Sequence, residues 1–309
     1  SASTPTREKA AHAGDADTLE RATNVNGEET SMSELTDQIS KHYGNAGLPG
    51  RILTALKQAG KNMDTLTVED LAPIDQFHTR GLPATRELLA YAGVRPGWRV
   101  LDVGSGLGGP ARVLASEKNC HVTGVDITKE FCEVATLLSK LTQLEHVTVF
   151  QHGDATALPF EEGQFDLALT MQIQMNIEDK RRFYGEIFRV LKAGGRFVFQ
   201  DIMSGPGGDV HLPVPWATQR ESSFLISVDT LRGTLEQVGF HIETLEDTSE
   251  EALAWRKSQP AAAGLAPSAL GMHVVMGAQF ALMQSNQVRN LEERRVAYVR
   301  GAASKSKIA

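Results

Sequence analysis

The sequence contains the stretch Val100-Leu-Asp-Val-Gly-Ser-Gly-Leu-Gly-Gly-Pro110, and this stretch decides the fold class. Its apolar residues lead into four glycines, and a helical pattern that includes Ala111, Val113 and Leu114 follows. The order predicts a strand, a tight turn and the start of a helix, because a turn with few side chains lets backbone approach a ligand. The spacing Gly104-x-Gly106-x-x-Gly109 also satisfies the dinucleotide fingerprint, so its surroundings must decide which ligand it binds.

Acidic residues follow at the ends of later predicted strands. The strand that begins at Cys120 ends in Asp126, about 20 residues after the glycine turn, where a carboxylate can accept both hydroxyls of a ribose. A third strand, from Val147, ends at Asp154-Ala155. The segment Phe188–Asp201 then predicts a helix, the glycine turn Leu191-Lys-Ala-Gly-Gly195 and another strand.

This ordered set closely resembles the class I S-adenosylmethionine-dependent methyltransferases, over residues 95–245. The resemblance is to small-molecule enzymes of methyltransferase type 11, and the Leu107-Gly-Gly-Pro110 loop is similar to those of sterol, tocopherol and sarcosine/dimethylglycine methyltransferases. It implies a doubly wound, mostly parallel, Rossmann-like α/β sheet of seven strands with N-terminal helices and helical lid insertions. An NAD(P)-dependent oxidoreductase would account for Gly104 and Asp126, but not for Asp154-Ala155 or the second glycine turn.

The pattern of apolar residues also predicts how the chain is organised. The N-terminal stretch has almost no large apolar side chains and cannot offset its ordering entropy, whereas later stretches alternate between strand and helix periodicity. The expected strands are 98–103, 121–126, 147–151, 165–171, 196–202, 240–246 and 295–300, and the expected core helices are 109–118, 128–142, 179–191 and 228–237. The expected segments are a disordered arm (1–34), an N-terminal helical cap (35–97), the methyltransferase domain (98–301) with insertions at 203–227 and 249–291, and a frayed tail (302–309).

The composition narrows the partners. Hydrophobic residues make up 41% of the chain and charged residues 22%, as in globular proteins. The net charge of −7 argues against nucleic acid, which favours a basic patch. No apolar run approaches the ~18 residues that span a membrane, and no secretory leader opens the chain. With only two cysteines, we expect a cytoplasmic protein without a disulfide framework. The sequence leaves open whether it forms a homo-oligomer.

The resemblance implies how the cofactor would be held. The glycine turn would lie against the methionine portion, with Asp102 orienting the turn or the amino group. Asp126 would accept from the ribose hydroxyls, and Asp154 from the adenine amino group beside the Ala155 amide. Each acid taken singly could be an ordinary strand-end residue, but together with the glycines they favour ligand roles. The residues expected to bind S-adenosylmethionine are Asp102, Gly104, Gly106, Gly108, Asp126, Ile127, Asp154, Ala155, Met171 and Gln172.

The catalytic residues are less clearly marked. Several relatives that act on sugars and natural products carry a His-His pair after the fourth strand, whereas this chain has Met175-Asn176 there. That difference removes an imidazole base at this point, although methyl transfer depends mainly on alignment and needs a base only for a protonated acceptor. His78 and His273 are alternative bases, each with a bland reading as a turn or loop residue. The expected catalytic set is His78, Gln172, Asn176 and His273.

Apolar and aromatic residues near the two insertions suggest the acceptor wall. Methionine adapts to irregular shapes and tryptophan offers a flat face, although such residues are more often plain core. The expected substrate pocket consists of Met175, His211, Trp216, Phe224, Met272 and Met276. No cluster of His, Cys and Asp has convincing metal-ligand spacing, so we expect no metal site.

These observations predict an enzyme that transfers a methyl group from S-adenosylmethionine to a small, partly apolar, natural-product-like acceptor. Methylation of oxygen, nitrogen or carbon remains open at this stage. One alternative is an N-methyltransferase of a small amine such as sarcosine or dimethylglycine. Further alternatives are a protein that binds the cofactor without catalysis and an NAD(P)-dependent oxidoreductase.

Overall fold

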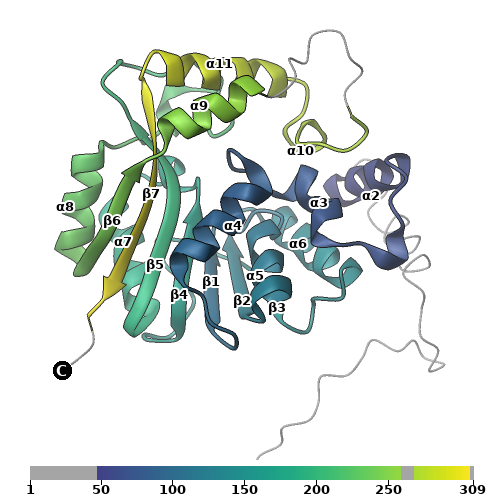
Figure 1. Cartoon of the computed structure of the whole chain (residues 1–309), viewed down its shortest axis with the longest axis horizontal. Helices are drawn as coiled ribbons and strands as arrows, with labels where there is room; N and C mark the ends of the chain where they lie inside the picture. Colours follow the sequence, from purple (N-terminus) through teal and green to yellow (C-terminus); the bar gives the residue numbers. More distant parts are fainter. Residues whose placement is uncertain (1–46, 259–267, 307–309) are drawn as a thin grey trace, which may run out of the picture.

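The computed structural model describes residues 47–258 and 268–306, which form one seven-stranded sheet with helices on both faces (Figure 1). The strand order is β3-β2-β1-β4-β5-β7-β6. Within the described sheet, only the pairings of β7 with β5 and with β6 are antiparallel. The expected doubly wound, mostly parallel sheet is therefore confirmed. The disordered arm expected at 1–34 lies outside the described residues.

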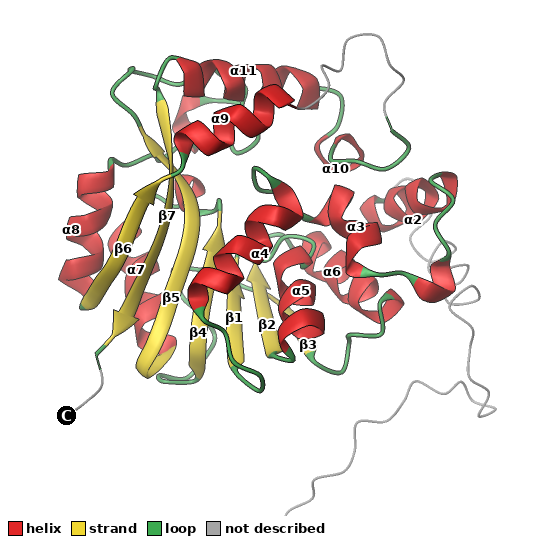
Figure 2. Ribbon diagram, viewed as in Figure 1, coloured by secondary structure: helices red, strands yellow, loops and turns green. Residues whose placement is uncertain are grey.

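Most core elements begin and end close to the residues that the sequence predicts (Figure 2). The strand expected at 196–202 is an exception: it begins at Leu191, which already pairs with Phe165, so the expected glycine turn at 191–195 lies inside this strand. The strands are β1 (Arg99–Val103), β2 (His121–Asp126), β3 (Thr148–His152), β4 (Phe165–Met171), β5 (Leu191–Ser204), β6 (Phe240–Asp247) and β7 (Val296–Lys305). The helices are α2 (Leu48–Gln58), α3 (Val68–Asp75), α4 (Gly81–Ala92), α5 (Gly109–Lys118), α6 (Lys129–Leu141), α7 (Lys180–Val190), α8 (Val228–Val238), α9 (Ser249–Ser258), α10 (His273–Met276) and α11 (Phe280–Glu292). Short 3₁₀ turns are η1 (Met63–Thr65), η2 (Gln174–Asn176) and η3 (Arg220–Ser222).

The central strands β1 and β4 are buried along almost their whole length, as expected for parallel strands that are covered on both faces. Helices α4 and α5 cover one face, where Leu88 and Val113 belong to the same cluster as Val100 and Leu167. Helices α7 and α8 cover the other face.

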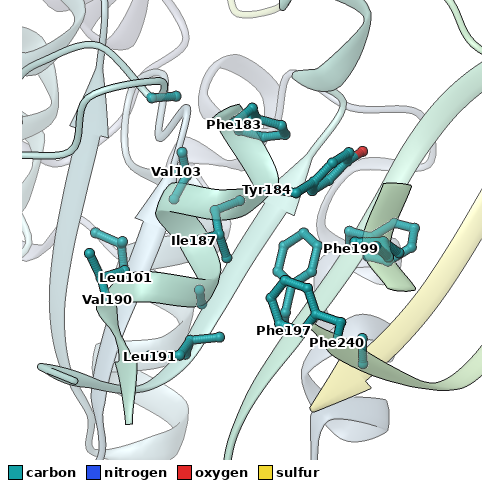
Figure 3. Packing of buried hydrophobic residues seen from close by; sticks show 14 of the residues in the cluster. Leu101, Val103, Phe183, Tyr184, Ile187, Val190, Leu191, Phe197, Phe199 and Phe240 are labelled. Atoms are coloured by element: carbon teal, nitrogen blue, oxygen red, sulfur yellow. The ribbon is translucent and has the colours of Figure 1, made fainter. Parts of the chain in front are cut away.

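The second face holds the aromatic part of the core (Figure 3). Tyr184 and Ile187 of α7 belong to one cluster with Leu101 of β1 and Phe197 of β5. The rings of Tyr184 and Phe197 lie 6.0 Å apart, centroid to centroid. Because both faces are packed, the edge at which the parallel strands end is where the sheet can receive a ligand.

The C-terminal strand corrects one prediction. The tail expected to fray over 302–309 is wrong for residues 302–305, because β7 continues to Lys305 between β5 and β6. The segment has no large apolar side chain, so its composition is that of a tail. The preceding residue is also small for a steric reason, since a Cβ at Gly301 would lie 2.3 Å from the ring of Phe199. The domain therefore extends beyond 301, to at least 305.

The N-terminal helices divide between two roles. Helix α4 belongs to the helical layer of the sheet. Helix α2 packs on α6 and α3 packs on α5, and a cluster that includes Leu53, Leu71 and Leu138 connects them. The part of the expected cap before residue 47 lies outside the described residues. Figure 1 shows α9 and α11, from the second expected insertion, above the edge at which the parallel strands end. Among the described helices, none is both long and apolar enough to cross a lipid bilayer.

Candidate functional site

A cleft of about 780 Å³ opens at the edge where β1, β2, β3 and β4 end. The turns after these four strands and the segment between α3 and α4 line it. The parallel arrangement explains the position, because the carboxyl ends of the strands meet at one edge of the sheet. Within the described residues, this edge brings together most of the cofactor residues that the sequence predicts.

The glycine turn after β1 adopts a conformation that favours glycine. Gly104, Gly106 and Gly108 have φ angles of 73°, 52° and 78°. At Gly104 a Cβ would also lie 2.4 Å from the side chain of Ile173, which follows β4. Gly104 and Gly106 line the cleft, whereas Gly108 lies behind them as the N-cap of α5.

Asp126 is held in place by the turns on either side of it. Its Oδ2 accepts a hydrogen bond from the Gly106 amide (2.9 Å), and its Oδ1 accepts one from the Thr128 amide (2.8 Å). A carboxylate can accept about four hydrogen bonds, so both oxygens keep capacity for a ligand hydroxyl. Ile127 beside it is 66% exposed and presents an apolar face at the cleft.

Asp102 lies deeper in the cleft, at the end of β1. It is 1% exposed, and its Oδ2 has no hydrogen-bond partner among the described residues. Burial, assisted by the neighbouring charge of Asp126, raises the pKa of Asp102 to about 7. The carboxyl group is therefore close to its midpoint of titration at neutral pH and would respond to a cation in the cleft.

The turn after β3 supplies Asp154 and Ala155. Asp154 Oδ1 accepts from the Thr156 amide (2.7 Å) and hydroxyl (2.8 Å), and these hydrogen bonds lower the pKa of Asp154. Its other carboxylate oxygen makes no hydrogen bond in the described structure. Both Asp154 and Ala155 line the cleft.

The turn after β4 supplies Met171, Gln172 and Asn176. Gln172 has a φ of 58°, which is unusual for a residue other than glycine, and its Nε2 is buried without a partner among the described residues. Asn176 donates from Nδ2 to the carbonyl oxygen of Trp216 (2.7 Å). This contact ties the turn to the first insertion.

His78 lines the cleft from the segment before α4 and is 6% exposed. Its Nε2 lies 3.0 Å from the Gly81 carbonyl oxygen and 3.0 Å from Thr85 Oγ1. The Thr85 hydroxyl donates to Gln76 Oε1 (2.6 Å), so both neighbours of Nε2 act as acceptors. These contacts assign the proton to Nε2 and the lone pair to Nδ1. Burial lowers the pKa of His78 to about 4, which keeps the ring neutral.

The other predicted substrate and catalytic residues do not line this cleft. Met175 and Trp216 pack in a core cluster under the first insertion with Ile202 and Tyr298, because both side chains can exclude water there. Phe224 donates its amide to the Met175 carbonyl oxygen (2.8 Å). His211 Nε2 pairs with Glu293 (2.8 Å). The remaining three residues, Met272, His273 and Met276, lie at α10. His273 lines a separate groove between α10 and α2.

The sequence prediction also missed residues of the cleft. Phe77 and Phe131 line it together, in an edge-to-face contact with centroids 5.6 Å apart. Asp75 lines it as well and forms a fully buried ion pair with Arg112 of α5 (2.8 Å). Phe77 lies next to His78 in the sequence and could have been included with it. The other contacts join distant segments and leave no local signal.

The charge of the cleft is one-sided. Among the described residues, no lysine or arginine lines it. Its acidic lining residues are Asp75, Asp102, Asp126, Asp154, Glu178 and Asp179. No group of three or more His, Cys, Asp or Glu in the described part of the chain is arranged to hold a metal ion. The cleft therefore has the electrostatic character of a site for a neutral or cationic ligand.

Comparison with known proteins decides the family. Residues 101–199 match the family described as a methyltransferase domain. Methyltransferase GfsG of Streptomyces halstedii is 30% identical over 230 residues, which cover 74% of this chain and 81% of that protein. The chain belongs to the S-adenosylmethionine-dependent methyltransferases. The predictions of family, fold and cofactor are therefore confirmed, while the roles of individual site residues stay predictions.

Two further methyltransferases show how far the likeness reaches. A phosphoethanolamine N-methyltransferase of Triticum aestivum is 28% identical over 175 residues, which cover 57% of this chain. The chain spans only about a third (34%) of the length of that relative. The solved geranyl diphosphate C-methyltransferase of Streptomyces coelicolor A3(2), in complex with S-adenosyl-L-homocysteine, has a TM-score of 0.60 at 16% identity. The match covers 72% of this chain and 78% of that one, and at this identity it shows the fold alone.

The cleft of this methyltransferase fits the family's cofactor. Four of its lining residues carry buried polar atoms without a partner among the described residues, namely Asp75 Oδ1, Asp102 Oδ2, Ser105 Oγ and Gln172 Nε2. Buried polar atoms without hydrogen bonds are costly, so a polar ligand that reaches them would be stabilised. A cationic sulfonium would also meet a favourable field.

Proposed function

We propose that this protein transfers the methyl group of S-adenosylmethionine to a small, partly apolar organic acceptor that carries no phosphate or carboxylate. The observation that carries the proposal is the acidic cleft without lysine or arginine among the described residues. An anionic acceptor would have to enter against these carboxylates with no basic side chain to pair with. Apolar side chains in the same lining would receive the rest of the acceptor: Phe77, Phe131, Met171, Ile173 and Ile177.

The cofactor would be held by the residues at the strand ends. Asp126 would accept from the ribose hydroxyls, Asp154 and Ala155 would bind the adenine edge, and Asp102 with the glycine turn would bind the methionine end. When bound, S-adenosylmethionine supplies an activated methyl group on a sulfonium centre. The oriented Asp126 oxygens and the free oxygen of Asp102 support this assignment.

Of the two histidines predicted as bases, His78 is the one that lines the cleft, and we assign it as the base for the acceptor. A proton that leaves an acceptor hydroxyl or amine would pass to Nδ1 of His78, since Nε2 is held as a donor by Gly81 and Thr85. Gln172 and Asn176 would orient the acceptor from the turn after β4, and alignment of this kind can contribute several kcal/mol. His273 is not part of this proposal because it lies in the separate groove.

The acidic lining of the cleft also ranks the alternative acceptors. Sarcosine and dimethylglycine carry a carboxylate and would meet the acidic lining, so we place them behind uncharged natural-product-like acceptors. An amine without an acidic group remains compatible with the cleft. Whether oxygen, nitrogen or carbon receives the methyl group depends on the acceptor that the screen identifies.

The test begins with calorimetric titration of S-adenosylhomocysteine and of NADH, followed by methyl transfer to matched acceptors. The pairs are geraniol against geranyl diphosphate and ethanolamine against phosphoethanolamine, together with sarcosine and a panel of uncharged aromatic alcohols. We expect one-site binding of S-adenosylhomocysteine alone and transfer only to acceptors without an acidic group. Transfer only to phosphates or carboxylates would overturn the acceptor class. Binding without transfer to any acceptor would indicate a non-catalytic protein, and binding of NADH alone would indicate an oxidoreductase.

A further inference from the structure

The turn between β4 and α7 lines the cleft at the residues proposed to orient the acceptor. It enters through Gln172 in the left-handed region and contains the short 3₁₀ turn η2. A non-glycine residue in that conformation persists only where surrounding contacts hold it. Two buried charged side chains, one from β5 and one from α7, make those contacts.

Asp201 holds the beginning of the turn. It lies near the end of β5 and is 1% exposed. Its Oδ1 accepts from the amides of Ile173 (2.9 Å) and Gln174 (3.1 Å), and its Oδ2 accepts from the Thr170 hydroxyl (3.2 Å). Hydrogen bonds to a carboxylate are stronger than those between neutral groups, so this side chain determines where the turn starts.

Lys180 holds the end of the turn. It is the first residue of α7 and 7% exposed, and its Nζ donates to the carbonyl oxygens of Gln174 (2.6 Å) and Ile177. No carboxylate lies within ion-pair distance of it among the described residues. A lysine in the first turn of a helix opposes the helix dipole, so local helix stability does not explain it. Its contacts with the preceding turn do.

The two side chains thus bind opposite ends of one turn. Amides at its start face the carboxyl group of Asp201, and carbonyl oxygens at its end face the ammonium group of Lys180. We propose that Asp201 and Lys180 are positioning residues that together hold Gln172 and Asn176 in place for methyl transfer. The catalytic part of this inference rests on the function proposed above, whereas the structural part does not.

The pKa values of both groups agree with this arrangement. Burial raises the pKa of Asp201 to about 7 although the amides of Gln174 and Ile173 oppose the shift. Burial lowers the pKa of Lys180 to about 8 although Asp201 opposes it. Each group is kept in a costly environment, which the fold of the sheet does not itself require.

The test compares Lys180→Met with Lys305→Met as a matched control. Lys305 belongs to β7, and its ammonium group contacts the C-terminal end of α7. Lys305 is also largely buried, and its Nζ donates to the carbonyl oxygens of Phe188 (3.0 Å) and Leu191 (2.9 Å), away from the cleft. Three quantities are measured: amide hydrogen exchange over residues 172–178, the dissociation constant of S-adenosylhomocysteine, and kcat and KM with an acceptor found in the screen.

For Lys180→Met we expect exchange in the turn to rise at least tenfold and kcat to fall at least tenfold. The dissociation constant of S-adenosylhomocysteine should stay within about threefold, because Asp126 and Asp154 are untouched. Lys305→Met should leave the turn and kcat unchanged. Wild-type exchange and wild-type kcat in Lys180→Met would overturn the inference, and so would a cofactor affinity that falls in parallel with kcat.

Asp201→Asn and Asp201→Leu test the other end. Asn keeps an oxygen acceptor for the Ile173 and Gln174 amides, so kcat should stay within about threefold, whereas Leu should lower kcat at least tenfold and expose both amides to exchange. Should Asp201→Leu fail to fold, Asp201→Asn and Lys180→Met decide the question. If no acceptor is methylated, the proposed function fails. Hydrogen exchange over residues 172–178 still tests whether Asp201 and Lys180 hold the turn. Equal kcat in Asp201→Asn and Asp201→Leu would overturn the inference.

Discussion

Asp126 combines two tasks at the level of a single side chain. It aligns the glycine turn through Gly106 and the following turn through Thr128, and it keeps free lone pairs toward the cleft. Asp102, on the neighbouring strand, is instead buried and lacks a partner for one oxygen. The two carboxyl groups therefore allow separate predictions.

Asp126→Ala should weaken binding of S-adenosylhomocysteine by about 2 kcal/mol, or about thirtyfold, because a charged double acceptor is lost. Calorimetric titration measures the change. Asp166→Ala is the control: Asp166 also accepts from a backbone amide, that of Arg99 (2.9 Å), and pairs with Lys192 (2.7 Å), but it does not line the cleft. Unchanged affinity in Asp126→Ala would refute the ribose assignment.

Asp102 predicts a pH dependence of stability. The folded protein keeps this proton up to a pKa of about 7, while the unfolded chain loses it near the ordinary value of 3.8. The folded state therefore binds more protons between these values, and its free energy of unfolding falls as the pH rises through this range. Asp102→Asn should remove that loss and raise the free energy of unfolding at pH 8 by about 4 kcal/mol.

Urea unfolding at pH 5 and pH 8 measures this effect for both proteins. At pH 5 the difference between wild type and Asp102→Asn should be smaller, about 2 kcal/mol, because this pH lies only about one unit above the pKa of the unfolded chain. Asp102→Asn should also bind S-adenosylmethionine more weakly, because the substitution that stabilises the fold removes a negative charge from the cofactor cleft. Lower stability of Asp102→Asn at pH 8 would contradict the buried, unpaired environment.

At the scale of elements, the close approach of α3 and α5 shapes the floor of the cleft. A Cβ at Gly109, the first residue of α5, would lie 2.4 Å from the Asp75 carbonyl oxygen in α3. This approach also lets Arg112 of α5 reach Asp75 inside the protein. The close packing of α3 against α5 thus requires a glycine at position 109.

Gly109→Ala should lower the free energy of unfolding by about 2 kcal/mol, because backbone must move to accept the methyl group. Gly185→Ala is the matched control, since Gly185 lies inside α7 and a Cβ there meets nothing within 4 Å. That change should instead stabilise the protein by about 0.5–1 kcal/mol through helix propensity. Chemical denaturation of the two variants decides between these signs, and equal effects would argue against the close helix contact.

At the scale of the whole molecule, the last strand in the chain, β7, is inserted between β5 and β6. It pairs with β5 over nine positions from Ser204↔Val296 to Arg196↔Ser304, and with β6 on its other side. Strand β6 has β7 as its only neighbour in the described sheet. The residues of β7 therefore attach the edge strand β6 to the rest of the sheet.

Removal of residues 301–309 should lower the Tm by more than about 10 °C or prevent folding, because half of β7 and most of its pairing with β6 are lost. Removal of residues 307–309 alone should leave the Tm within about 2 °C. Thermal unfolding followed by circular dichroism compares the two. A stable protein that ends at Arg300 would show that β7 does not need its second half.

Sequence patterns determined the sheet, its core helices and most of the strand-end residues that line the cleft. Glycines, strand periodicity and acids at strand ends are local signals, and parallel strands carry their ends to one edge whatever else the chain does. Tertiary structure decided the rest. It buried Met175 and Trp216 in the core and placed His273 in a separate groove. It also brought Asp201 and Lys180 to the two ends of one turn. Such outcomes depend on which distant segments meet and exclude water, and apolar or charged residues carry no local mark of the partner they will find.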